Sequence, residues 1–131
     1  MTSAIGIRPI EAWMARDLVC VLPTEEDVLK YTPNLDKVKS LPGLLLHITA
    51  AGNDSDCVTR SYAPKLNVPE DPVCGSGHCH VAVLWAEKFK TNALVAYQAS
   101  KRGGTLYCRL NGDRVALAGK AVVFAESEIQ I

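Results

Sequence analysis

Apolar residues occur in short blocks along this chain, and glycine, proline and asparagine separate the blocks. The nearly all-apolar runs at 17–22 and 44–49 have the length and the β-branched content of buried strands. Residues 57–62 alternate in polarity and follow a polar turn at 52–56, which predicts a hairpin between the second and third strands. The same pattern predicts four more strands, at 94–98, 105–110, 114–118 and 121–125.

Turn residues and alternation also mark the end of the chain. The pair Asn111-Gly112 is a strong hairpin signal between two of the later strands. Residues 126–131 alternate between polar and apolar, so they predict an edge strand on this molecule or on a partner.

One continuous apolar run, Val81 to Ala86, lies in a segment that predicts a helix. The segment from Cys79 to Phe89 has no glycine or proline and carries Lys88 near its end, as helices do. Because this helix is apolar all round, we expect it to be enclosed on all sides. Shorter helices are predicted at 24–30, where Thr24 is a typical N-cap, and at 35–40.

About seven strands and one wholly apolar helix favour a sheet that curls around the helix. We therefore predict an α+β fold with a β-barrel-like sheet rolled around a central helix. The 131 residues suffice for one domain, spanning 1–131.

Composition excludes several kinds of partner. Lys plus Arg and Asp plus Glu both number 14, so no basic field indicates nucleic acid or anionic membrane. No apolar run approaches the roughly 18 residues that span a bilayer. Residues 1–8 lack the pattern of a secretory signal, and five cysteines, an odd number, favour a reducing compartment, so we expect a cytoplasmic protein.

The stretch before the predicted helix is the candidate binding site. Pro72 and the glycines predict a turn up to about Gly77 that feeds the helix start. The free N–H groups of Gly75, Ser76 and Gly77 would form an anion site there. The stretch lacks the Lys-Ser/Thr pair of a phosphate-binding loop, so a small carboxylate is expected rather than a nucleotide. Arg60 and Arg102 are available countercharges, although each is more often a solvated surface residue.

Several side chains in this stretch have two interpretations each. Asp71 could hold a ligand hydroxyl or a proton, or it could be a capping aspartate, and Ser76 has the same ambiguity. Cys74 could be a thiolate at the helix N-terminus, acting as nucleophile or base, or a buried inert thiol. His78 could move protons or simply bond the backbone.

A metal site is disfavoured. Cys74 and His78 have a suitable spacing, but His78, Cys79 and His80 point in different directions on a helix. No second cluster of cysteine and histidine completes four ligands, so we expect no metal.

The segment from Glu70 to Cys79 resembles the signature of the PhzF-like, or phenazine-biosynthesis-like, isomerase family. Further segments resemble the same family, at 59–64, 85–88, 96–104, 111–115 and 119–121. Members of this family are about twice as long and have two similar halves, each a sheet rolled around a central helix as in diaminopimelate epimerase. This chain resembles the C-terminal half.

The resemblance implies proton transfer without a cofactor. It implies that Asp71 positions and protonates the substrate, while Gly75 and Ser76 bind it through a carboxylate. The catalytic candidates are therefore Asp71, Cys74 and Ser76, and the substrate-binding candidates are Gly75, Ser76, Gly77 and His78.

The chain also departs from the family pattern. The acid/base glutamate and a companion histidine of the family lie in the N-terminal half. Gly77 stands where alanine is common, and Cys74 replaces a frequent threonine and coincides with a catalytic cysteine of diaminopimelate epimerase.

Two classes of function follow. The first is an isomerase whose other half-site comes from a separate N-terminal half or from a second copy in a homodimer. The second is a half-domain without turnover, which binds small carboxylates or has a structural role only.

Overall fold

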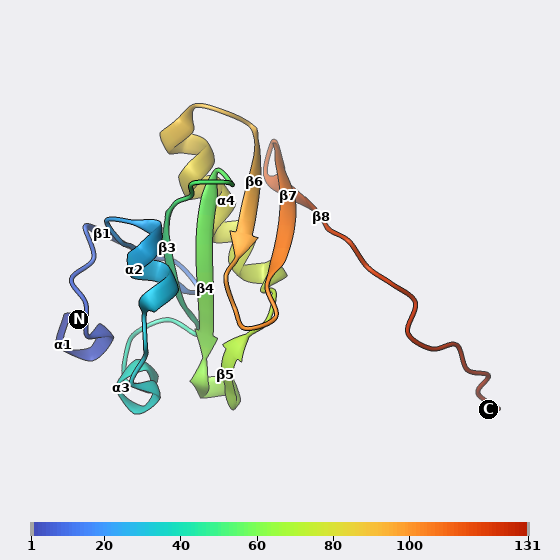
Figure 1. Cartoon of the computed structure of the whole chain (residues 1–131), viewed down its shortest axis with the longest axis horizontal. Coiled ribbons are helices and arrows are strands. Elements are labelled where there is room, and N and C mark those ends of the chain that lie inside the picture. The colour runs from blue at the N-terminus through green and yellow to red at the C-terminus, as the bar shows by residue number, and fades with distance from the viewer. Residues whose placement is uncertain (1, 131) are drawn as a thin grey trace.

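The computed structural model describes residues 2–130, and within them eight strands form one mixed sheet (Figure 1). The strand order is β1-β2-β3-β4-β6-β7-β8, with β5 paired to β4 beside this path. In chain order the elements are α1 (Thr2–Ile5), β1 (Glu11–Met14), β2 (Leu18–Val21), α2 (Glu25–Lys30), α3 (Leu35–Lys39), β3 (Leu46–Ala51), β4 (Cys57–Ala63), the 3-10 turn η1 (Pro64–Leu66), β5 (Val68–Asp71), α4 (Gly75–Phe89), β6 (Ala93–Gln98), β7 (Gly104–Asn111) and β8 (Arg114–Ala118).

The hairpins follow the sequence pattern. Strands β3 and β4 pair antiparallel across the turn at 52–56, as predicted. Strands β7 and β8 also pair antiparallel, with Asn111 opposite Arg114 and Gly112 at a φ of +60°. Two pairs are parallel, β2 with β3 and β4 with β6, and helices lie in the connections between these strands.

Helices cover both faces of the sheet, which explains the nearly all-apolar strands. On β2, Leu18 and Cys20 pack with residues of α2 and α3, whereas Val19 and Val21 pack with α4. Figure 1 shows α2 and α4 on opposite sides of the strands. A strand buried on both faces cannot alternate in polarity, so its sequence is apolar throughout.

Helix α4 begins at Gly75, whereas the sequence predicted a turn up to about Gly77 that feeds the helix start. Cys74 is its N-cap, and the Sγ of Cys74 accepts a hydrogen bond of 3.3 Å from the N–H of Gly77. This cap offsets the poor helix propensity of the glycines in the first turn. The helix ends at Phe89, and Lys90 adopts a left-handed φ of +55°.

The sheet covers one side of α4 only. Val81, Ala82 and Trp85 are buried, and the Nε1 of Trp85 donates a hydrogen bond of 2.9 Å to the Oγ1 of Thr49 on β3. On the opposite side Val83 is 45% exposed. The prediction of a helix enclosed on all sides is therefore wrong, because the all-apolar pattern did not show how many sides the domain itself would cover.

The fold is α+β, as predicted, but its sheet is open. Strands β1 and β8 form its two edges, and within residues 2–130 they do not pair with each other. The short strands β1 and β5 were not predicted, since each has only four residues and depends on its neighbour for pairing.

The end of the chain also differs from the prediction. Residues 119–130 have no regular secondary structure and extend away from the sheet in Figure 1. Val122 and Phe124 are 90% and 99% exposed, so the predicted strand at 121–125 does not form. The edge strand predicted at 126–131 is also absent from 126–130, and residue 131 lies outside the described part of the chain.

None of the helices within residues 2–130 combines the length and the apolar character that crossing a bilayer requires.

Candidate functional site

The first turn of α4 forms the centre of the candidate site. Ser76 is exposed there, and Gly75 is half-buried. The N–H of Gly77 is already bonded to the Sγ of Cys74, so of these three N–H groups only those of Gly75 and Ser76 have no acceptor within the described residues. The predicted anion site thus has two main-chain donors rather than three.

Asp71 lies at the end of β5, directly before this turn. Its Oδ1 accepts a hydrogen bond of 3.1 Å from the N–H of Val73, which fixes the turn that leads into α4. The main-chain carbonyl of Asp71 accepts another, of 3.0 Å, from the Nε2 of buried Gln98. The carboxylate is half-buried and close enough to the Cys74 thiol to affect its pKa.

Cys74 is a buried thiol, with 2% of its surface exposed. Burial raises its pKa above the ordinary value of 9.0, and this effect outweighs the hydrogen bonds from Gly77 and Ser76, which lower it. The nearby carboxylate of Asp71 raises the pKa further. At neutral pH Cys74 is therefore a thiol that caps α4, which disfavours the thiolate considered from the sequence.

His78 is fully buried beneath the same turn. Its Nδ1 lies 2.7 Å from the carbonyl oxygen of Cys74, so Nδ1 carries the proton and donates it to that oxygen. Burial lowers the pKa of His78, which keeps the ring neutral. Its Nε2 has no hydrogen-bond partner within the described residues.

A polar cluster that the sequence analysis missed lies next to Ser76. The carboxylate of Asp17, just before β2, is fully buried and pairs with Arg16 through bonds of 3.1 and 2.6 Å. The Nη2 of Arg16 also donates a hydrogen bond of 3.0 Å to the Oγ of Ser76. The Nε2 atoms of His47 and His80 lie 3.1 and 3.4 Å from Asp17 Oδ2. An aspartate at the start of a fully buried strand was the available signal.

The protonation of Asp17 and His47 follows from their burial and contacts. Burial raises the pKa of Asp17, but hydrogen bonds from Arg16 and His47 lower it by more. The pKa therefore lies below its ordinary value, and the carboxylate is ionised. Burial lowers the pKa of His47 despite the opposing effect of Asp17. An ionised carboxylate only accepts hydrogen bonds, so the Nε2 of His47 carries the proton. The Nδ1 of His47 then accepts a hydrogen bond of 2.8 Å from the Oγ of Ser61.

Ser61, His47 and Asp17 therefore form a hydrogen-bonded chain of the kind found in hydrolases. All three residues have 0% exposed surface, so Ser61 cannot reach a substrate as a nucleophile. These hydrogen bonds tie the start of β2 to β3 and β4 rather than forming a second active site.

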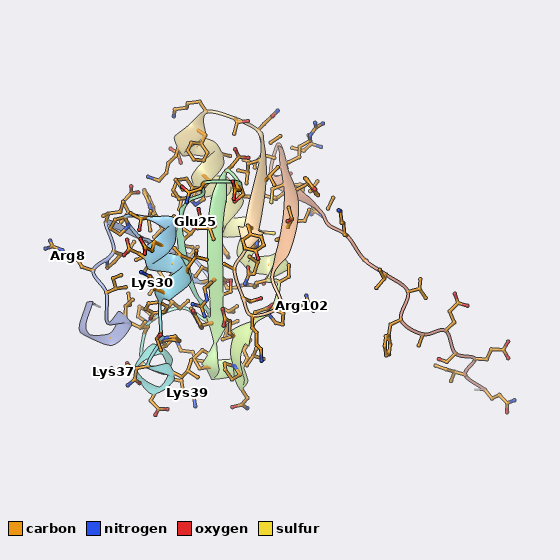
Figure 2. The ribbon with its side chains drawn as sticks, in the orientation of Figure 1. Arg8, Glu25, Lys30, Lys37, Lys39 and Arg102 are labelled. Carbon is orange, nitrogen blue, oxygen red and sulfur yellow. The ribbon has the colours of Figure 1, made fainter. Side chains whose placement is uncertain are left out.

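The two predicted countercharges differ in availability. The guanidinium of Arg60 pairs with Glu70 at 2.7 and 3.0 Å and with the carbonyl of Tyr31, so it is used within the fold. Arg102 lies at the turn between β6 and β7, where Figure 2 shows it at the surface. It lines an open groove of about 790 Å³ together with Gly75 and the start of the C-terminal segment.

The cysteine and histidine residues around the turn do not form a metal site. Cys79 is exposed, whereas Cys74 and His78 are buried. Within residues 2–130 no group of three or more histidine, cysteine, aspartate or glutamate side chains is arranged to hold a metal ion.

Comparison with known proteins agrees with this fold and motif. Residues 7–127 match the model of the phenazine biosynthesis-like protein family, so the chain belongs to that family. It is 39% identical to an uncharacterized isomerase of Pseudomonas aeruginosa, over 100% of this chain and 51% of the relative. It is 34% identical to an uncharacterized isomerase of Halalkalibacterium halodurans, over 98% of this chain and 50% of the relative.

Solved structures of the family have the same fold. A PhzF-family protein of Enterococcus faecalis is 42% identical, with a TM-score of 0.90 over 95% of this chain and 48% of that protein. A PhzC/PhzF protein of Clostridium difficile is 38% identical, with a TM-score of 0.90 over 99% and 51%. The chain thus spans about half the length of the relatives that it matches.

Proposed function

We propose that this chain supplies one half of an isomerase that moves a proton on a small carboxylic acid without a cofactor. The observation that carries the proposal is the exposed first turn of α4, where Gly75 and Ser76 keep free donors beside Asp71. Relatives that share this segment are named isomerases, which supports the reaction class.

In this proposal the turn binds the carboxylate of the substrate. The N–H groups of Gly75 and Ser76 and the Ser76 hydroxyl donate to its oxygens, and the positive end of the α4 dipole favours the negative charge. Asp71, directly before the turn, exchanges a proton with the substrate carbon. Cys74 acts as a proton donor at most, because burial keeps it a thiol.

We further propose that a second body completes the site. The exposed side of α4 and the unpaired edge β1 leave Val83 and Trp13 at 45% and 55% exposure. Apolar surface of this kind in a folded domain usually marks an interaction site. A second copy of this chain in a homodimer, or a separate N-terminal half, would cover this surface, complete the roll of the sheet around α4 and supply a second acid/base.

A half-domain without turnover is the alternative. It is favoured by the buried, neutral state of Cys74 and His78, which leaves Asp71 as the one candidate base at the turn within the described residues. In that case the turn would bind a carboxylate and exchange no proton with it.

Solvent exchange distinguishes the two. The purified chain is incubated in deuterated water with a panel of small carboxylic acids, alone and with a glutamate-bearing half, and deuterium incorporation is measured by mass spectrometry. We expect incorporation that falls at least about 100-fold in Asp71→Asn, because a general acid/base is lost. Asp36→Asn, which changes an exposed carboxylate on α3, is the matched control. If none of the acids incorporates deuterium in either mixture, the proposed isomerase function is contradicted.

A further inference from the structure

The Asp17 carboxylate is a fully buried charge that several segments hold in place. It accepts hydrogen bonds from Arg16, from the N–H of Leu45 at 3.3 Å and from the Nε2 of His47 at 3.1 Å. The ring of His80 lies near the same oxygen as His47. An unpaired buried carboxylate destabilises a fold strongly. The side chains that donate to Asp17 are therefore held in place by these hydrogen bonds.

Arg16 links this cluster to the exposed turn of α4. Its Nη2 donates to the Oδ2 of Asp17 at 2.6 Å and to the Oγ of Ser76 at 3.0 Å. A guanidinium has donors only, so the oxygen of Ser76 is the acceptor and its own proton must be donated elsewhere. Within the described residues the other partner of this hydroxyl is the Sγ of Cys74, at 3.7 Å. A carboxylate oxygen is a far better acceptor than a thiol.

We propose that Arg16, held by buried Asp17, is a positioning residue that fixes the Ser76 hydroxyl as a hydrogen-bond donor toward the carboxylate of a ligand. This inference rests on the proposed function, because it takes a carboxylate at Gly75 and Ser76 as the ligand. It adds a specificity element that lies 60 residues before Ser76 in the chain.

An ordinary surface arginine would not have this effect. Exposed ion pairs contribute little, because two long side chains must be ordered in water. Arg16 differs, since its guanidinium pairs in a bidentate manner with a carboxylate that has 0% exposed surface, while its own side chain is 50% exposed. A lysine could keep the charge at this position, but its single ammonium could not hold Asp17 and Ser76 together in one geometry.

The first experiment needs no ligand. NMR couplings that report the χ1 rotamer of Ser76 are measured in the wild type, in Arg16→Lys and in Arg8→Lys. Arg8 points away from the molecule in Figure 2 and serves as the control. We expect one rotamer in the wild type and the control, and averaging among rotamers in Arg16→Lys. A rotamer that is averaged in the wild type, or unchanged in Arg16→Lys, overturns the proposal. Arg16→Met is the second variant if Arg16→Lys does not fold.

The second experiment measures binding of sodium benzoate through the amide signals of Gly75, Ser76 and Gly77, with benzamide as the uncharged comparison. Loss of one charge-assisted hydrogen bond predicts a dissociation constant about tenfold higher in both Arg16→Lys and Ser76→Ala. If Arg16 acts through Ser76, the double variant loses no more than either single variant. Losses that add, or Arg16→Lys binding as tightly as the wild type, overturn the proposal.

The two experiments separate this inference from the proposed function. A fixed Ser76 rotamer that depends on Arg16, together with no benzoate binding by the wild type, would support the positioning by Arg16 and contradict the carboxylate site. Benzoate binding that is independent of Arg16 would support the site and contradict the positioning.

Discussion

Gly77 shows how one missing side chain connects the buried cluster to α4. A Cβ atom at this position would meet the Cε1 of His47 and would lie 2.9 Å from its Nδ1 and 3.0 Å from the Sγ of Cys74. The ring of His47 is fully buried and bonded on both sides, so it cannot move away cheaply. The glycine therefore gives His47 the space that it needs beneath the helix.

We expect Gly77→Ala to destabilise the protein, although alanine favours helices. Overpacking of this kind costs about 1–3 kcal/mol, and because the ring of His47 is held in place the cost is expected to exceed the gain of at most about 1 kcal/mol in helix propensity. Urea unfolding at neutral pH measures the change. Gly119→Ala is the matched control, because its Cβ would meet only the carbonyl of Thr105 at an ordinary 3.5 Å. A Gly77→Ala variant as stable as the wild type would show that His47 has room to shift.

Single residues also show the limits of sequence interpretation at this site. Asp71, Cys74, Ser76 and His78 lie in one short stretch, so their neighbourhood could be predicted from their spacing. Their protonation could not, because it depends on burial, which the sequence does not report. The cluster around Asp17 brings together side chains that are far apart in the chain, so the sequence could single out Asp17 at the start of a buried strand but not its partners.

At the scale of elements, α4 depends on its cap. The Sγ of Cys74 is the one side-chain acceptor at the helix start within the described residues, since it binds the N–H of Gly77. The first turn contains two glycines, which makes the helix start weak without this bond. The cap therefore positions the main-chain donors of the candidate site.

We expect Cys74→Ala to lower the free energy of unfolding by about 1 kcal/mol, as loss of an N-cap does. Cys74→Ser keeps an acceptor of similar size at the cap and should be closer to the wild type. Urea unfolding compares the stabilities, and hydrogen exchange at Gly77 reports the cap itself. Equal exchange at Gly77 in all three proteins would contradict the capping role.

Element prediction succeeded where the local pattern was sufficient. Strand β2 and the β3–β4 hairpin followed from apolar runs and a polar turn, and α2 has the predicted Thr24 cap with a full capping box. Strands β1 and β5 are too short to have a pattern of their own. The segment 121–125 has the pattern of a strand but pairs with neither open edge of the sheet.

At the scale of the whole molecule, uncovered apolar surface is the main feature. The exposed side of α4, the edge strand β1 and the C-terminal segment carry exposed large apolar side chains, including those of Val83, Trp13 and Phe124. The sequence predicted the apolar character of these segments but not their exposure. Exposure follows from the open sheet, whose two edges remain unpaired within residues 2–130.

We expect the chain to associate in solution, because such surface is costly to leave in water. Light scattering over a range of concentrations measures the mass. Phe124→Asp should shift a homodimer toward monomer, whereas Gln130→Asp, which changes a polar residue of the same segment, should not. A monomer at every concentration would contradict the homodimer and leave the separate N-terminal half as the proposed partner.

The C-terminal segment has one more consequence. Its first residues, from Gly119 to Val122, line the same groove as Gly75 at the start of α4. A partner subunit that binds this segment therefore changes the position of one wall of the groove. Thermodynamic linkage then requires a reciprocal effect, in which a ligand that tightens subunit association is itself bound more tightly by the assembled pair, and by the same factor.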